Sequence, residues 1–271
     1  MNQSSLFDLT GQTAVIIGGT GVLGGAMAEA LAAAGASVVV AGRNAAKGQQ
    51  RAHAICERGG RCLFVSCDAM DETSLKTLLA ETRAWSEVPH ILVNAAGGND
   101  PRVTLTPGKT LAEIDTEAWR EVFDLNLVGG VLLPCRVLGS AMLEANRGSI
   151  INIASVSAHI PLSRVLAYSA SKAAVLNLSQ FLAREWAPFH VRVNTITPGF
   201  FPAEQNRSLL FHPDGTPTPR AEAILTHTPM KRFGESNDLA GALIFLASSA
   251  ASGFVTGTDI RVDGGFLSQT I

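Results

Sequence analysis

The chain has 271 residues, 46% hydrophobic and 16% charged, proportions that exclude a disordered protein and allow one domain with a sizeable core. A formal net charge of -2 gives no reason to expect nucleic acid or an anionic membrane surface as a partner. The start, MNQSSLFDLTG, does not resemble a signal peptide, and the four cysteines lack C-x-x-C spacing. We therefore expect a cytoplasmic protein with reduced cysteines and no bound metal.

Short β-branched segments alternate with longer helical segments along almost the whole chain. Strands are predicted at 13–18, 36–41, 62–67, 90–95, 148–154, 191–196 and 258–262, and helices at 22–34, 44–58, 71–85, 116–145, 166–187 and 235–249. Most of the strands are almost entirely apolar, as expected of strands covered on both faces. The pattern predicts an α/β protein, in which residues 1–271 form a single domain with a doubly wound (Rossmann) parallel sheet of about seven strands and helices on both faces.

A membrane span is the alternative for residues 9–42, which contain only one charged side chain, Glu29. Glycines between residues 18 and 25 break this stretch into strand-like, helix-like and strand-like parts, so we expect no membrane span.

The first predicted strand runs into GGTGVLGG, which an alanine-rich helix follows. Glycines in such a turn allow a tight bend, a close approach to a pyrophosphate and close helix packing, while the helix start offers free N–H groups to the phosphates. The placement predicts a dinucleotide site, and an ordinary tight turn is the alternative. The cofactor contacts expected here are Gly18, Thr20, Gly21, Val22, Leu23 and Gly24.

The second predicted strand ends in VVVAGRN, and this end bears on the choice of dinucleotide. An acidic residue would bind the adenosine ribose, but Gly42 stands there and Arg43 and Asn44 follow. A guanidinium binds a phosphate with two hydrogen bonds, so Arg43 favours NADP(H). The alternative is an exposed arginine at the start of the next helix.

Two further strand ends offer cofactor contacts. Asp68, with Ala69, follows the third strand and could accept a hydrogen bond from the adenine amino group, or it could begin the next helix as its N-cap. After the fourth strand, small residues leave room for a ligand, although an ordinary strand-end turn explains them equally. These residues are Asn94, Ala95, Ala96 and Gly97.

Tyr168 is the only tyrosine of the chain, and Lys172 lies on the same helix face four residues later. A nearby cation stabilises a phenolate, so we expect a lowered pKa for Tyr168 and a role in acid–base catalysis. Ser155 follows the fifth strand and could hydrogen-bond the same carbonyl oxygen that Tyr168 protonates. Asn126 lies amid apolar residues of a long helix, where a hydrogen-bonded core amide is the alternative to a proton-relay role.

The segment 200–234 is longer than a connection between a strand and a helix needs to be. It follows the sixth strand on the carboxyl side of the sheet, where open α/β folds bind ligands. We expect a substrate lid here, with a disordered insertion as the alternative.

The glycine turn, NAAG at 94–97, Asn126, Ser155, YSASK at 168–172 and PG at 198–199 together resemble the short-chain dehydrogenase/reductase family, from about Thr10 to Phe266. The resemblance implies a hydride-transferring oxidoreductase with Ser155, Tyr168 and Lys172 as its catalytic core. It also implies that Asn126 helps to hold a water in a proton relay and that Lys172 binds the nicotinamide ribose. Pro198 and Gly199 are then cofactor contacts, and the chain forms a homotetramer.

Two positions depart from the family pattern. Ile17 replaces the usual threonine before the first glycine, and Val22 occupies the usual place of the middle glycine. The hydrogen bonding inside the turn is therefore expected to differ.

NAAGGNDP at 94–101 and the segment 199–235 are similar to the D-mannonate oxidoreductase (fructuronate reductase) type of the family, which implies D-fructuronate and D-mannonate as substrates. A polyhydroxylated anion needs amides and a guanidinium, which Asn99, Gln205, Asn206 and Arg207 supply, with Arg207 assigned to the carboxylate. This type favours NAD, in conflict with Arg43, so NADP and NAD both stay open. The other readings are a reductase of another carbonyl, such as a 3-oxoacyl thioester, and a non-catalytic dinucleotide-binding sensor.

Overall fold

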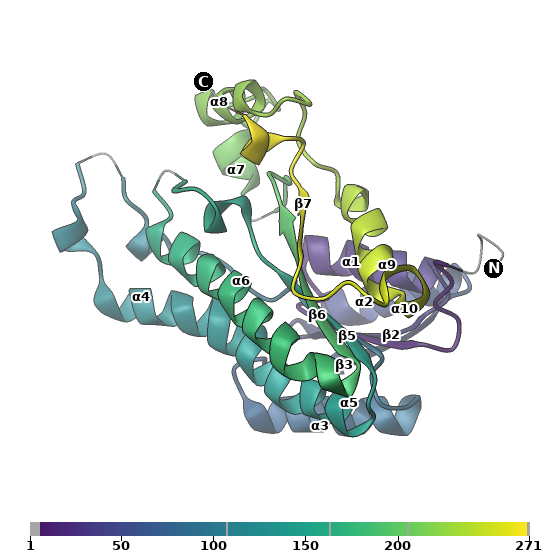
Figure 1. Ribbon diagram of the computed structural model, residues 1–271. Coiled ribbons are helices and arrows are strands. Elements are labelled where there is room, and N and C mark those ends of the chain that lie inside the picture. The colour runs from purple at the N-terminus through teal and green to yellow at the C-terminus, as the bar shows by residue number, and fades with distance from the viewer. Residues whose placement is uncertain (1–5, 107, 163, 205, 270–271) are drawn as a thin grey trace.

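The computed structural model describes residues 6–106, 108–162, 164–204 and 206–269 (Figure 1). Across these residues seven strands form one sheet in the order β3-β2-β1-β4-β5-β6-β7, and every neighbouring pair is parallel. The predicted α/β class and parallel Rossmann sheet are therefore confirmed. The strands are β1 Thr13–Ile17, β2 Ser37–Gly42, β3 Arg61–Ser66, β4 Ile91–Asn94, β5 Gly148–Ile153, β6 Val191–Pro198 and β7 Asp259–Val262.

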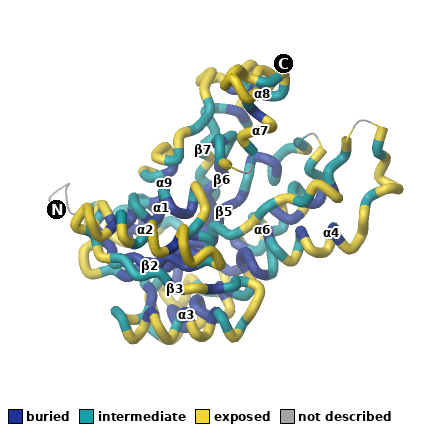
Figure 2. Tube along the Cα trace, turned by 180° about the vertical axis from the view of Figure 1, so that it is seen from behind, coloured by how far each residue is buried: buried dark blue, intermediate teal, exposed yellow. Residues whose placement is uncertain are grey.

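Helices cover both faces of the sheet (Figure 1). Their bounds are α1 Val22–Ala33, α2 Ala45–Glu57, α3 Glu72–Trp85, α4 Thr116–Phe123, α5 Ser140–Glu144, α6 Leu166–Trp186, α7 Arg207–Leu210, α8 Pro219–His227, α9 Ala240–Ala247 and α10 Ser249–Ser252. Successive strand residues point to opposite faces, so Val38 and Val40 belong to the core cluster that includes α1 and α9, whereas Val39 belongs to the cluster that includes α3 and α6. Figure 2 shows the buried residues concentrated in the sheet and in the helix faces that contact it.

The helix predicted at 116–145 is helical as expected, but two stretches, Asp124–Leu132 and Cys135–Gly139, are π-helical. Pro134 lies between them and has no N–H to donate, and its ring crowds the carbonyl of Gly130, which favours wider turns. In the described part of the chain this is the one helix long and apolar enough to cross a membrane, and half of its most apolar window is buried. Val131, Leu138 and Met142 pack under the sheet, so it is a core helix.

The segment 200–234 has structure of its own and stands above the carboxyl ends of β6 and β7 (Figure 1). It contains α7 and α8, joined through an antiparallel bridge between Phe211 and Pro217. Leu210, Ala221 and Ile224 form a small buried cluster beneath three phenylalanines. The described part of this segment is therefore a packed helical unit, contrary to the disordered alternative.

Candidate active site

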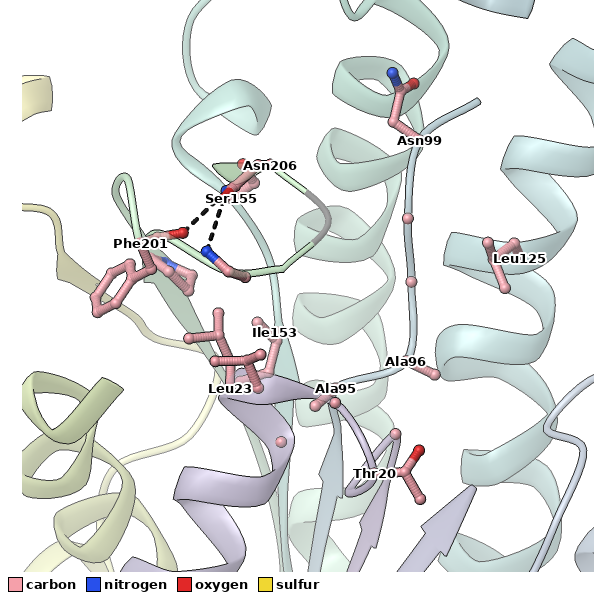
Figure 3. A pocket seen from close by; sticks show the side chains of 18 of the residues that line it. Thr20, Leu23, Ala95, Ala96, Asn99, Leu125, Ile153, Ser155, Phe201 and Asn206 are labelled. Carbon is pink, nitrogen blue, oxygen red and sulfur yellow. Dashed lines mark hydrogen bonds between the residues drawn. The ribbon is translucent and has the colours of Figure 1, made fainter. Parts of the chain in front are cut away.

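A cleft of about 1540 Å³ runs along the carboxyl ends of the strands. The glycine turn lines one end of it, and the start of α6 and the segment 200–234 line the other. Figure 3 shows Thr20 and Leu23 near the glycine turn, with Asn99 and Asn206 at the opposite end. Of the predicted cofactor residues, the following line this cleft: Gly18, Thr20, Gly21, Val22, Leu23, Gly24, Arg43, Asp68, Ala69, Ala95, Ala96, Gly97, Tyr168, Lys172, Pro198 and Gly199.

The glycine turn has no room for side chains at two of its positions. Gly18 has φ +81°, and a β-carbon there would lie 2.7 Å from the amide nitrogen of Ala96. A β-carbon at Gly24 would collide with the carbonyl of Gly18. The first turn of α1 opens on the cleft at Gly21, and no described side chain caps it. A shallow turn with free N–H groups fits the pyrophosphate of a dinucleotide.

The end of β2 explains why no acidic residue stands there. A β-carbon at Gly42 would lie 2.6 Å from Oγ1 of Thr20, so Thr20 occupies the space that an acidic side chain would need. Arg43 lines the cleft beside this point and forms no ion pair within the described ranges. Asn44 does not line the cleft, because its side chain caps α2 and accepts a hydrogen bond from the Lys47 amide at 3.0 Å.

Asn94 is placed beneath the cleft and does not line it. Its side chain is 1% exposed, and its amide nitrogen donates to Oδ1 of Asn152 at 2.8 Å. Asp68 lines the cleft, and its carboxylate accepts a hydrogen bond from the Met70 amide at 3.0 Å. The N-cap of α3 is Asp71, so the alternative that Asp68 begins this helix is wrong.

Tyr168 and Lys172 lie on one face of α6 and line the cleft together. Nζ of Lys172 is 5.8 Å from the centre of the Tyr168 ring and donates a hydrogen bond of 2.7 Å to the carbonyl of Ile153. This lysine is only 5% exposed, and burial lowers its pKa to about 8.

The expected lowering of the Tyr168 pKa is wrong for this structure. Burial raises the pKa of the phenol, and a hydrogen bond with Ser155 opposes the shift only in part. The ring packs on one side against the cluster formed by Val103, Ala118 and Val122, which removes water from that side. At neutral pH the phenol therefore keeps its proton.

Ser155 follows β5 and lines the cleft. Its Oγ accepts hydrogen bonds from the hydroxyl of Ser157 at 3.0 Å and from the Ser157 amide at 3.2 Å. Because both contacts use the oxygen as the acceptor, the hydroxyl proton of Ser155 is left to donate. Ser157 is 3% exposed and was not singled out in the sequence.

Asn126 is fully buried in the first π-helical stretch and does not line the cleft. Its amide nitrogen donates to the carbonyls of Gly98 at 2.7 Å and Val122 at 2.8 Å, and its oxygen accepts from the Gly98 amide at 3.1 Å. The side chain is thus a hydrogen-bonded core amide. It fixes the chain after β4 against the long helix.

The predicted substrate residues divide into two groups. Asn99 and Asn206 line the cleft, and the Asn206 side chain bonds the backbone of Phe201 and Ala203 (Figure 3). Arg207 does not line the cleft, because its guanidinium lies 5.5 Å over the ring of Phe211, which corrects the assignment to a carboxylate. Gln205 lies outside the described residues.

Two other arginines, Arg164 and Arg220, line the cleft, whereas Arg207 does not. Neither of them is identified in the sequence analysis. The only local signal for Arg164 is its position four residues before Tyr168 in PLSRVLAY.

Known proteins resemble this chain over almost its whole length. A family model described as Enoyl-(Acyl carrier protein) reductase matches residues 20–267. A Bacillus subtilis protein named "Uncharacterized oxidoreductase UxuB" is 40% identical, over 97% of this chain and 97% of that protein.

Two crystal structures share the fold and contain a dinucleotide. A Haemophilus influenzae protein, a candidate D-mannonate oxidoreductase with bound NAD, has a TM-score of 0.92 at 36% identity, over 99% of each chain. A gluconate 5-dehydrogenase from Burkholderia cenocepacia, in complex with NADP and tartrate, has a TM-score of 0.87 at 30% identity, over 98% of this chain and 99% of that one. The chain belongs to the short-chain dehydrogenase/reductase family and is an NAD(P)-dependent oxidoreductase that acts on CH–OH groups.

Proposed function

We propose that this enzyme interconverts D-fructuronate and D-mannonate, a sugar-acid ketone and its alcohol. One observation carries the proposal: Ser155, Tyr168 and Lys172 share a single cleft with the glycine turn at one end and with amides and guanidinium groups at the other. The Haemophilus influenzae relative is a candidate for this activity, and the Burkholderia cenocepacia relative is named for another sugar acid, which supports the substrate class.

Several residues of the chain have separate roles in the reduction of the ketone. When bound, the reduced dinucleotide supplies the hydride. Tyr168 gives its proton to the ketone oxygen, which the raised pKa of the phenol permits because the proton is present at neutral pH. Ser155, held by Ser157, donates a hydrogen bond to the same oxygen.

Lys172 and Asn126 support these two groups. The carbonyl of Ile153 holds the ammonium of Lys172, which binds the nicotinamide ribose and places positive charge beside the phenol as the proton leaves. Asn126 fixes the backbone of Gly98 on one side of the cleft. Its proposed role in the water relay is to hold this part of the cleft in place.

We further propose that residues 1–271 form a single domain and that the chain works as a homotetramer in the cytoplasm. We also propose that segment 200–234 is the substrate lid. Support for the lid is the ion pair of 2.7 Å between Glu204 and Lys47, which joins the segment to α2. Both residues line the cleft, so the pair connects its two sides.

The cofactor is proposed to be NADP(H), bound through Arg43. Arg43→Ala is expected to weaken NADPH binding by about 10- to 100-fold, because the mutation removes a charge-assisted contact to the 2′-phosphate. Fluorescence titration of NADPH measures the change, and NADH, which lacks this phosphate, is the internal control. Equal affinity of wild type and mutant for NADPH would show that Arg43 does not bind the phosphate.

The substrate proposal is tested by measuring the loss of nicotinamide absorbance with a panel of ketones and both reduced cofactors. The panel contains D-fructuronate, other keto-sugar acids, neutral ketoses and a 3-oxoacyl thioester. We expect the highest kcat/KM for D-fructuronate. A preference for the thioester or for neutral ketoses would contradict the proposal.

A further inference from the structure

The substrate end of the cleft contains two arginines that have no ionic partner among the residues the structure describes. Arg164 lies in the loop that leads into α6, and Arg220 lies in the first turn of α8. Both line the cleft together with Ser155 and Tyr168. Within the described ranges neither guanidinium forms an ion pair or a hydrogen bond, whereas Arg102, for example, contacts both Asp100 and Glu121.

Both guanidinium groups line the same cleft, and the positive charge of Arg164 acts on Arg220. Arg220 is half-buried, and its pKa is lowered first by burial and then by the charge of Arg164. A cation in the first turn of a helix also opposes the helix dipole, which favours negative charge at that end. The placement of Arg220 is therefore unfavourable for the protein alone, and an anion between the two groups would remove the repulsion.

The backbone conformation of Arg164 is also unfavourable. Its φ is +77°, in the left-handed region that L-residues other than glycine and asparagine rarely adopt. The carbonyl of Arg164 accepts a hydrogen bond of 2.9 Å from the Leu105 amide, which holds this conformation in place. Strained residues of this kind concentrate at ligand sites, where the surrounding structure maintains them.

We propose that Arg164 and Arg220 together bind the carboxylate of the sugar-acid substrate and so select acids over neutral sugars. Two planar guanidinium groups can each donate a pair of hydrogen bonds to one carboxylate, which accepts them on two oxygens. The ketone and the carboxylate of D-fructuronate lie toward opposite ends of its carbon chain, so the first can face Tyr168 while the second reaches the arginines. The inference rests on the proposed function, because it assumes an acidic substrate.

The proposal also assigns part of the site to the segment 200–234. Arg164 belongs to the main fold, whereas Arg220 belongs to α8, so an acid bound between them links the segment to the body of the enzyme. A neutral ketose could not make this link.

Three single variants and one double variant, Arg164→Asn with Arg220→Met, test the pair. Arg164→Asn suits the left-handed backbone, Arg220→Met keeps the apolar stem, and Arg220→Lys keeps the charge but loses the two-pronged geometry. Arg207→Met is the matched comparison, since Arg207 lies over Phe211 outside the cleft. For each, kcat and KM are measured with D-fructuronate and with the neutral ketoses that wild type reduces, and NADPH binding by fluorescence checks that the protein is folded.

We expect Arg164→Asn and Arg220→Met each to raise the KM for D-fructuronate by about 10- to 100-fold, the range for losing a hydrogen-bonded charge contact, with a smaller change in kcat. Arg220→Lys should lie between wild type and Arg220→Met, and Arg207→Met should match wild type. NADPH affinity should stay unchanged in all of them, and the double variant should lose its preference for acids.

Two results would overturn the inference in distinguishable ways. If wild type reduces D-fructuronate but the Arg164 and Arg220 variants keep its KM, the inference fails and the proposed function stands. If wild type reduces only neutral ketoses, both fail together.

Discussion

Tyr168→Phe is expected to lower kcat by roughly 10²- to 10⁴-fold, because it removes the proton that the ketone oxygen receives. The variant loses one hydroxyl and keeps the ring that packs against Val103, Ala118 and Val122, so its thermal stability should match wild type. Steady-state kinetics with D-fructuronate and NADPH measure the loss. Fluorescence titration is the control, because NADPH binding should persist.

An ordinary turnover number in this variant would contradict the role of the phenol. A large loss accompanied by weaker NADPH binding would instead indicate a damaged cleft, and Ser155→Ala separates the two cases. It keeps the Tyr168 phenol but removes the second hydrogen bond to the substrate oxygen, together with the contact between Ser155 and Tyr168, so it should also lower kcat at constant NADPH affinity.

Lys172→Met is expected to abolish most activity while leaving the free energy of unfolding nearly unchanged at pH 7. The pKa of Lys172 falls from 10.5 to about 8 on burial, which corresponds to a cost of roughly 3 kcal/mol for the charged form. Replacing it relieves this cost but leaves the carbonyl of Ile153 without its donor, which costs about 1–3 kcal/mol. Kinetics and thermal unfolding of the same sample measure the two effects.

The same lysine gives a dependence on pH with a definite sign. Its folded pKa lies below its unfolded value, so the burial cost is fully present below about pH 8 and disappears as the pH rises toward 10.5. The free energy of unfolding of the wild type should therefore rise as the pH increases from about 8 to 10.5. The rate of reduction should fall over the same range as the ammonium is lost. A Lys172→Met variant whose stability changes in parallel with wild type over this range would contradict the assignment.

The sheet could be predicted closely because each strand is a short apolar run with turn residues at its ends. Such a pattern can be recognised within a few consecutive residues. β1, β5 and β6 begin at the predicted residues, and each of the seven strands ends within two residues of its predicted end. The π-helical turns could not be predicted in this way. They depend on Pro134 and on contacts with distant residues, such as that of Asn126 with Gly98.

The site residues also differ in how far the sequence predicts them. The glycine turn and the pair Tyr168–Lys172 are patterns within a few residues, so the sequence indicates them. Arg164 and Arg220 belong to separate segments that only the fold brings together. The polar neighbours of Arg207 in the sequence indicate a substrate contact, but α7 directs its guanidinium to the Phe211 ring. The direction of the Tyr168 pKa was missed because the sequence shows the cation but not the burial.

The close contact between Thr20 and Gly42 limits how the coenzyme preference of this enzyme could be re-engineered. An aspartate placed at position 42 to hold the ribose of NAD would meet the Thr20 side chain, since even a β-carbon there lies 2.6 Å from its hydroxyl. Gly42→Asp alone should therefore weaken binding of both coenzymes. Combined with Thr20→Gly, which empties that space, it should move the enzyme toward NAD, so specificity here is encoded by a pair of positions and not by one.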